Sequence, residues 1–475
     1  MVETTQEVRY RDLREYLDLL ESAGLLKRIR AEVDLKHELG AICAMAMDKG
    51  LPHALSFENI KGYPGHSVVS NIMFSMEELA VVFNAEADSE TLYSIAVEGM
   101  RNRVPSLVVE TGPCKEETHF GDDVDLFEMP TPWWHERDGG QYLGTQAGVI
   151  TRDPETGILN MGTFRCMIID KNTLTLSGQI IGKNRDVAKN DANGVSTPVA
   201  LALGMDPLLT LASGTKVPAE ANGFMEYEAA GAWRWAASEL VKCETSDLLV
   251  PARAEVIIEG EIPYGVTVPE GPHGESTGFY QGHPAARMIK VKAITHRRDP
   301  IIYGLICRQT EDYPRWLMRA GSFAKRLADQ SGFDNIREVF FPEWGGWTGG
   351  QGFMIIAAEI RNQDEPKRII EECWKLTPNK WVILVDEDCD VHDIDEVMWR
   401  VHTSVDGNRD VIIRGAGEPE PTATEDGPRR FEPPAHPLGM NASFKFKNMP
   451  DLPLNLISKE LKTRVRGRWR ELGLV

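Results

Sequence analysis

Two acids and one arginine are the residues of this sequence whose types and surroundings best support chemistry. The acids bracket the segment Glu270-Gly-Pro-His-Gly-Glu275, and the arginine ends the segment Asn160-Met-Gly-Thr-Phe-Arg165. Their offset would send the two carboxylates to opposite faces of a strand, and on a helix they would diverge by about 140°. Glycine and proline break both patterns, so we expect a bend that aims both acids into one pocket. Two acids beside an arginine can hold a carboxylate substrate and deliver a proton to it.

The length and composition indicate an ordinary globular protein of more than one domain. A chain of 475 residues is too long for one core and predicts two or three domains. It contains no apolar run long enough to span a membrane, and residues 1–7 lack the basic and apolar regions of a secretory signal. The seven cysteines are scattered without a C-x-x-C pair, which favours reduced thiols over disulfides or a zinc site. We therefore expect a cytoplasmic protein.

The formal charge of −20 argues against partners that are themselves negatively charged. Nucleic acid and anionic membrane surfaces both require a basic face, so neither is expected as a partner. A solvated acidic surface is the simplest interpretation of the charge. An anionic substrate would then need local positive charge inside its pocket, which draws attention to Arg165.

The periodicity of the first third predicts an N-terminal α/β segment followed by a β-rich region. Apolar spacing predicts helices over 10–23, 38–48 and 77–84 and a strand over 26–33. From about Pro130 the expected strands are short and separated by Gly, Pro and Asp turns. They cover residues 148–152, 163–170, 254–259, 288–294 and 301–307, with a helical excursion over 226–241. This β-rich pattern is typical of a barrel or a sandwich.

The last third predicts a second α/β layer. After a helical stretch over 314–332, we expect strands at 336–340, 353–359 and 381–386 and helices at 365–374 and 394–401. The proline-rich residues 415–439 predict a long loop, and a helix over 456–472 closes the chain. The basic residues of that last helix favour a solvated or subunit-facing surface.

Several common motifs are absent. The segment Gly178-Gln-Ile-Ile-Gly-Lys183 has three residues between its glycines and an asparagine after the lysine, so it is not a P-loop. The sequence has no H-E-x-x-H, no G-x-S-x-G and no G-x-G-x-x-G after a strand. The sequence therefore carries none of the usual motifs of zinc proteases, α/β-hydrolases or dinucleotide-binding enzymes.

The remaining motifs resemble, in order, those of the UbiD family of prenylated-flavin decarboxylases, and the resemblance runs over nearly the whole chain. They are Asp12–Leu17, Asp138–Gly144, Ile150–Pro154, Asn160–Arg165, Val241–Thr245, Glu270–Glu275 with Thr277–Tyr280, and Val385–Asp390. Each is weak alone, but together and in the same order they are specific.

The resemblance implies an α/β (α+β) fold built around a central split β-barrel of the flavin-reductase type. It divides the chain into an N-terminal α/β segment (1–115), a cofactor-binding barrel (116–312), a linking helix (313–332), a C-terminal α/β domain (333–440) and a tail helix (441–475). It further implies self-association through the C-terminal part as a homodimer or hexamer.

By resemblance, Arg165, Glu270 and Glu275 are the catalytic residues, acting around prenylated FMN. Arg165 can fork two N–H donors onto the substrate carboxylate. Glu275, if desolvated beside another acid, would have a raised pKa and could donate the proton that replaces CO2. Glu270 would hold Arg165 in place, and the cofactor would accept electrons from the bond to the departing carboxylate.

The family binds its cofactor phosphate through a divalent metal, usually manganese with potassium nearby, held by an asparagine, a histidine and a glutamate. Asn160 and Glu226 match two of these ligands, whereas Lys183 stands where the histidine is expected. Two interpretations follow: the ion keeps fewer protein ligands, or the ammonium of Lys183 replaces it. The resemblance also assigns cofactor contacts to the strand and to one lysine of the C-terminal domain, namely Met161, Gly162, Thr163, Phe164, Arg165 and Lys375.

The sequence therefore predicts reversible, non-oxidative decarboxylation of an aromatic, heteroaromatic or α,β-unsaturated carboxylic acid, with a flavin prenyltransferase supplying the cofactor. Two alternatives stay open. The same site could run as a carboxylase, or the chain could bind a flavin without decarboxylating, as an oxidoreductase or a carrier. The intact Arg165, Glu270 and Glu275 argue against a carrier, which has no use for a carboxylate clamp.

Overall fold

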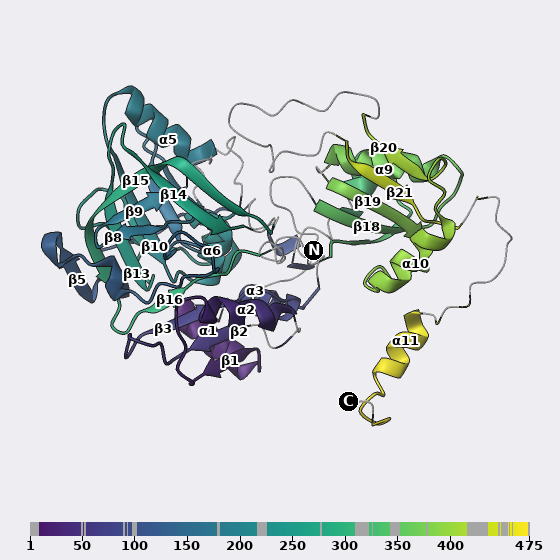
Figure 1. The fold of residues 1–475 in the computed structure, drawn as a ribbon, viewed down its shortest axis with the longest axis horizontal. Coiled ribbons are helices and arrows are strands. Elements are labelled where there is room, and N and C mark those ends of the chain that lie inside the picture. The colour runs from purple at the N-terminus through teal and green to yellow at the C-terminus, as the bar shows by residue number, and fades with distance from the viewer. Residues whose placement is uncertain are drawn as a thin grey trace. The chain divides into compact units, whose positions relative to one another are not determined.

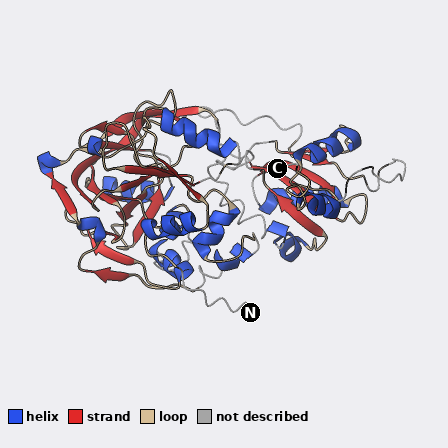
Figure 2. Cartoon of the chain, turned by 90° about the horizontal axis from the view of Figure 1, so that it is seen from below, coloured by secondary structure: helices blue, strands red, loops and turns tan. Residues whose placement is uncertain are grey.

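The computed structural model divides the chain into two compact units, Met1–Pro314 and Arg315–Val475. The structure describes residues 9–48, 51, 54–88, 91, 92, 94–96, 102–177, 181–215, 226–275, 278–308, 323, 324, 326–342, 352–376, 379–415, 436–444, 447, 455, 457 and 459–473, with only the backbone described at 181–185, 379, 380, 459, 460, 463 and 466. Both units contain helices and strands, so the fold is mixed α/β (Figures 1 and 2).

A small mixed sheet and three helices form the N-terminal layer of the first unit. The strands run in the order β1 (Leu26–Ile29), β2 (Ala54–Phe57), β3 (Ser67–Ser70) and β16 (Ile301–Tyr303). The helices are α1 (Leu13–Ser22), α2 (Glu38–Asp48) and α3 (Met76–Phe83). Because β16 comes from the end of the unit and pairs in parallel with β3, this layer is completed only by residues far along the chain.

An antiparallel nine-stranded sheet carries most of the first unit. Its main path is β7 (Leu159–Thr163), β6 (Gly148–Arg152), β10 (Thr197–Leu203), β13 (Val256–Ile262), β15 (Tyr280–His296), β9 (Thr173–Leu176) and β8 (Ile168–Asp170), and β14 (Thr267–Gly274) and β5 (Glu117–Phe120) also pair with β15. The strand pairings form an open path, and among the described residues none joins β8 back to β7.

Strand β15 organises this sheet, because it pairs with β13, β14, β5 and β9 along different parts of its length. Figure 1 shows β14 and β15 as long neighbouring ribbons across the sheet. The sheet and the N-terminal layer share one apolar core, which includes Leu39 and Phe57 of the layer and Leu201, Ile258 and Ile289 of the sheet. Burial of such side chains is the main stabilising term of the unit.

The helices and a short sheet complete the first unit. The helices are α5 (Ile181–Ala192), α6 (Pro207–Ser213) and α7 (Glu226–Arg234), with single 3-10 turns at Pro113–Lys115, Gly121–Asp123 and Leu126–Glu128. The short sheet has the order β12 (Leu249–Pro251), β11 (Glu239–Lys242) and β4 (Leu107–Val109). Helix α6 begins at Asp206, whose carboxylate accepts the N–H groups of Leu208 and Leu209.

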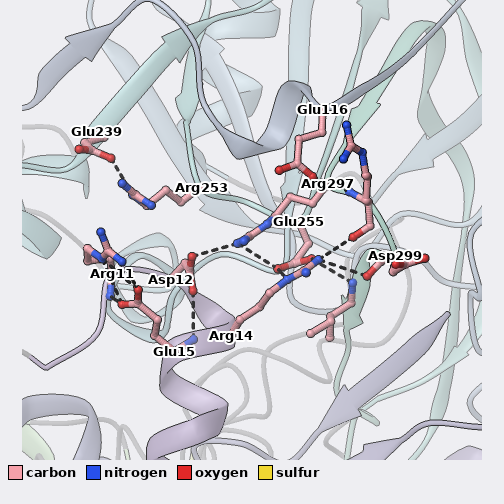
Figure 3. Close-up of polar contacts among 12 residues, drawn as sticks. Arg11, Asp12, Arg14, Glu15, Glu116, Glu239, Arg253, Glu255, Arg297 and Asp299 are labelled. Carbon is pink, nitrogen blue, oxygen red and sulfur yellow. Dashed lines mark hydrogen bonds and ion pairs between the residues drawn. The ribbon is translucent and has the colours of Figure 1, made fainter. Parts of the chain in front are cut away.

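A buried carboxylate fastens helix α1 to the ends of two sheet strands (Figure 3). Arg14 of α1 donates from Nε and Nη2 to the two oxygens of Glu255, at 2.8 and 2.7 Å. Arg297, which follows β15, lies 3.4 Å from Glu255 and donates at 3.0 Å to Asp12, the N-cap of α1. The amide of Ile301 also donates to Glu255, so this one side chain joins α1, β13, β15 and β16.

The second unit is a five-stranded sheet between two apolar cores. Its order is β17 (Ile336–Phe340), β18 (Gly352–Ala358), β19 (Asn379–Asp386), β21 (Leu438–Asn441) and β20 (Val411–Ile413), with helices α9 (Glu365–Leu376), α10 (Ile394–Ser404) and α11 (Lys459–Arg466). Alternate residues of β18 enter different cores: Met354 and Ile356 join the core that contains α9, while Phe353 and Ile355 join the core that contains α10. Strand β18 is accordingly buried along its whole length.

Most expected elements are present, with three corrections. Residues 163–170 are not one strand, because β7 ends at Thr163 and β8 begins at Ile168, so Arg165 lies between strands. The helix expected over 226–241 ends at Arg234, and β11 begins at Glu239. The segment around Glu270 is a bent strand rather than a free bend. The stretch expected as helix over 314–332 and the proline-rich loop over 415–439 lie largely outside the described residues.

None of the helices in the described part of the chain combines the length and the apolar character needed to cross a lipid bilayer.

Replacing Glu255 by glutamine should destabilise the first unit by roughly 3 kcal/mol, because Arg14 and Arg297 lose a buried carboxylate. The measurement is urea unfolding followed by circular dichroism. Glu261→Gln is the matched control on β13: its partner Lys292 is 45% exposed, and losing that surface ion pair should change stability by less than about 1 kcal/mol. Equal unfolding midpoints for the two variants would contradict the anchoring role of Glu255.

Candidate active site

Arg165 and Glu270 form a two-pronged ion pair inside the first unit. The Nε and Nη2 atoms of Arg165 donate to Oε1 and Oε2 of Glu270 at 2.9 and 3.0 Å. The arginine side chain is 15% exposed and that of Glu270 is fully buried. Two parallel charge-assisted hydrogen bonds fix the plane of the guanidinium as well as its position.

Glu275 contacts the same guanidinium from another side, through Nη1 of Arg165. Its side chain is 13% exposed, so it lies closer to solvent than Glu270. The amide of Glu275 donates to the carbonyl of Phe279, and Gly278 donates back to the carbonyl of Glu275, which closes a turn at this point. The structure therefore brings the three residues proposed from the sequence together, with one cation shared by two acids.

Tyr142 is a second donor to Glu270. Its hydroxyl lies 2.7 Å from Oε1 of Glu270. Burial favours the protonated form of Glu270, but the hydrogen bonds of Arg165, followed by that of Tyr142, outweigh burial and hold the pKa of Glu270 below its ordinary value. Burial, and then the charge of Glu270, raise the pKa of Tyr142, so the phenol keeps its proton and remains the donor.

The bend that carries the two acids belongs to strand β14 and is shaped by a close backbone approach. Its pairing with β15 shifts register on both sides of Glu270, and the Gly271-Pro272 peptide is cis. Gly139 donates to the carbonyl of Pro272 at 2.6 Å. A Cβ on Gly139 would lie 2.1 Å from the carbonyl oxygen of Gly271, so only glycine permits this contact.

The segment Asp138–Gly144 therefore joins the arginine to the acids. On one side, Leu143 donates to the carbonyl of Cys166 at 3.0 Å, next to Arg165. On the other side, the carboxylate of Asp138 accepts the amide of Gly274 at 2.8 Å. The sequence identifies Asp138–Gly144 as a motif of the family resemblance but assigns no function to its individual residues. Its paired glycines signal a close approach, whereas nothing in the sequence signals the bond from Tyr142 to Glu270.

The strand predicted to contact the cofactor lies against the start of helix α7. Asn160, Met161, Gly162 and Thr163 belong to β7, and Phe164 follows it. The carboxylate of Glu226 accepts the amide of Met161 at 3.0 Å, so the predicted metal ligand Glu226 lies beside the strand that carries Asn160. Thr163 makes a 2.6 Å contact with the hydroxyl of Ser213 on α6.

The structure neither supports nor contradicts the cofactor contacts predicted for two lysines. Lys183 belongs to helix α5, and its side chain lies outside the described atoms. Lys375 is exposed in the last turn of α9, in the second unit, and pairs with Glu372 on the same helix. The cofactor-contact roles assigned to these lysines therefore stay predictions.

Comparison with known proteins identifies the class to which this fold and site belong. Three regions match domains of 3-octaprenyl-4-hydroxybenzoate carboxy-lyase: the N-terminal domain over residues 17–96, the Rift-related domain over 107–309 and the C-terminal domain over 317–423. Over 431 residues the chain is 30% identical to the uncharacterized protein sll0936 of Synechocystis sp., covering 85% of this chain and 84% of that protein.

Solved structures give the same result. The UbiD-class enzyme HmfF from Pelotomaculum thermopropionicum, in complex with FMN, superposes with a TM-score of 0.81 and 29% identity over 95% of this chain and 98% of that one. An evolved dimeric form of HmfF in complex with prenylated FMN gives 0.78 and 29% over 94% and 97%. Vanillic acid decarboxylase of Sedimentibacter hydroxybenzoicus, in open form, gives 0.77 and 28% over 98% and 100%. The chain belongs to the UbiD family of carboxy-lyases.

Tyr142→Phe should destabilise the protein by about 1.5 kcal/mol at pH 7, since a buried hydrogen bond to a charged group is lost. The pKa of Glu270 is lowered in the folded state, so its stabilising contacts are fully present above the ordinary value of 4.5 and fade as pH falls through the folded value. The penalty of Tyr142→Phe should therefore shrink below about pH 4.5. Urea unfolding between pH 7 and pH 3 measures it.

Tyr63→Phe is the control for this pH series. The hydroxyl of Tyr63 donates to the carbonyl of Phe127, which does not titrate, so its penalty should stay constant. A pH-independent penalty for Tyr142→Phe would contradict the coupling of Tyr142 to the charge of Glu270.

Proposed function

We propose that this protein catalyses reversible, non-oxidative decarboxylation of an aromatic, heteroaromatic or α,β-unsaturated carboxylic acid with prenylated FMN. The observation that carries the proposal is the guanidinium of Arg165 shared between Glu270 and Glu275. This arrangement provides a fixed cation for the substrate carboxylate and a second acid within reach of the same place.

Glu270 acts as the positioning acid. Both of its oxygens are occupied by Arg165, one of them also by Tyr142, and it is fully buried. The lowered pKa keeps Glu270 anionic at neutral pH, so it carries no proton to donate. Its role is to hold the guanidinium plane so that Nη1 and Nη2 face the substrate carboxylate.

Glu275 acts as the proton donor. It contacts Arg165 through Nη1, whereas Glu270 holds Nε and Nη2, so an arriving substrate carboxylate can replace Glu275 without disturbing the pair with Glu270. Losing the guanidinium and facing another anion favours the protonated form of Glu275. A protonated acid beside the carbon that has lost CO2 is placed to deliver the replacing proton.

The residues predicted to hold the cofactor fit that role. Asn160 and Glu226 supply an amide and a carboxylate oxygen, the donors that manganese and magnesium prefer, and the carboxylate of Glu226 already lies at the backbone beside Asn160. The antiparallel strands around β15 support a split β-barrel for the cofactor-binding domain. Prenylated FMN supplies the electron sink for the bond to the departing carboxylate.

Co-expression with a flavin prenyltransferase, followed by an absorption spectrum and a screen of acids for CO2 release, tests the activity. Release of CO2 from at least one acid of the proposed classes is expected, and incorporation of labelled bicarbonate into product would report the reverse direction. A protein that binds the modified flavin but releases no CO2 from any of these acids would favour a flavin-binding role.

Glu275→Gln should lower turnover by about 10²–10⁴-fold while flavin content is unchanged, because a carboxamide cannot donate the proton that replaces CO2. Turnover is followed as CO2 release and flavin by its absorbance. Glu155→Gln removes an exposed acid that pairs with Lys189, and it should retain full activity. Full activity of Glu275→Gln would show that the proton comes from elsewhere.

Glu226→Gln separates the two interpretations of the phosphate site. The amide keeps an oxygen for Met161 but loses the charge that a divalent cation requires, so we expect manganese affinity to fall at least about ten-fold and flavin content to fall with it. Metal analysis and flavin absorbance measure both. Glu228→Gln, on the same helix, is the control. If Glu226→Gln keeps its flavin while Lys183→Met loses it, the ammonium of Lys183 replaces the ion.

A further inference from the structure

A compact group of potential metal ligands lies beside the site, on residues that the proposed reaction does not use. His135, Asp138 and His273 each offer one ligand atom, and these atoms all lie within 4.8 Å of one another. The carboxylate of Asp138 and the ring of His273 are fully buried, and the side chain of His135 is 19% exposed. Two imidazoles and one carboxylate form a donor set common to zinc and iron sites.

The nitrogen-to-oxygen distances within the group are longer than those of ordinary hydrogen bonds, although the contact of His135 with Asp138 is still within hydrogen-bonding range. Nδ1 of His135 lies 3.3 Å from Oδ2 of Asp138, and Nδ1 of His273 lies 3.5 Å from Oδ1. Ordinary N–H···O bonds are about 2.9–3.0 Å long. Two atoms each about 2.1 Å from a tetrahedral zinc ion are about 3.4 Å apart.

Hydrogen bonds with neighbouring backbone groups orient His135 and Asp138, in the way that such bonds orient the ligands of metal sites. Nε2 of His135 lies 3.0 Å from the carbonyl oxygen of Cys307, which fixes the proton on Nε2 and leaves the lone pair on Nδ1. The carboxylate of Asp138 accepts two backbone N–H groups, from His135 at 3.0 Å and Gly274 at 2.8 Å. Both features are usual around ligating histidines and carboxylates.

His273 is the second, independent observation. Its ring is buried and stacks on Tyr142 with centroids 4.1 Å apart. Among the described residues neither ring nitrogen has a hydrogen-bond partner, although Nδ1 faces Asp138. A buried imidazole without partners is costly, and an ion between Nδ1 and Asp138 would remove that cost.

We propose that His135, Asp138 and His273 form a binding site for a divalent transition metal ion of the zinc class, separate from the predicted cofactor metal at Asn160 and Glu226. Three protein ligands leave a fourth position for water. Because His273 lies on β14 between Glu270 and Glu275, which directly follows the strand, the bound ion fixes the bend that aims these two acids.

The test is a zinc titration of the full-length protein after metal removal, with a competing chelator and total metal analysis. We expect one strongly bound equivalent. His273→Phe keeps an aromatic ring against Tyr142 and removes a ligand. Asp138→Asn removes the charge and keeps an oxygen for one of the two backbone amides, which bind different oxygens of Asp138. Each should weaken zinc binding by at least roughly a hundred-fold. Cobalt gives a second readout, since its visible absorption bands should disappear in both variants.

Two controls locate the ion. His119 and His296 form another pair, with Nε2 atoms 3.1 Å apart, so His119→Gln reports any zinc bound there. Glu226→Gln reports zinc bound at the predicted cofactor metal site. Both should retain the strong equivalent. Unchanged binding in His273→Phe and Asp138→Asn, no strong zinc binding by the wild-type protein, or loss of binding only in a control variant would each overturn the proposal.

Discussion

The sharing of one buried guanidinium between two carboxylates governs the architecture of this site. Glu270 is fully buried, and a carboxylate there is tolerable only when its charge is compensated and its oxygens are hydrogen-bonded. Arg165 and Tyr142 do both, and Glu275 brings the local charge of the three ionised groups to −1. The surrounding backbone has to hold Arg165 at bonding distance from Glu270, because without the guanidinium the charge of the buried Glu270 would be uncompensated.

The need to hold Arg165 next to Glu270 explains the least regular part of the backbone in the first unit. The arginine comes from the turn after β7 and the acids from β14, and these segments do not pair with each other. Residues 138–144 connect them by hydrogen bonds to Cys166 on one side and to Pro272 and Gly274 on the other. Gly139 and the shifted register of β14 are therefore consequences of joining two distant segments at one guanidinium.

The sequence predicts the regular elements well and the contacts poorly. Strands 148–152 and 336–340 and helix 38–48 are observed at the predicted bounds, because periodic burial and turn residues are local signals. The predicted strand 163–170 is wrong because the chain leaves the sheet between Thr163 and Ile168, where Arg165 pairs with Glu270, a tertiary demand that outweighs local propensity. The three residues proposed from motifs and resemblance do converge. Tyr142, Asp138 and His135 could not be assigned, since their partners lie more than a hundred residues away or depend on the local turn geometry.

The pairing of strand β15 also affects how the chain is made. Strand β9 ends at Leu176, but it pairs with Arg287–Lys290 of β15, which is synthesised much later. Strand β5 likewise pairs only after residues 293–296 of β15 have been synthesised. A ribosome adding about 5–20 residues per second would leave these β edges unpaired for several seconds. Nascent chains of this protein therefore present open edges to their neighbours until nearly two thirds of the polypeptide has been synthesised, and this is the interval in which a chaperone would matter most.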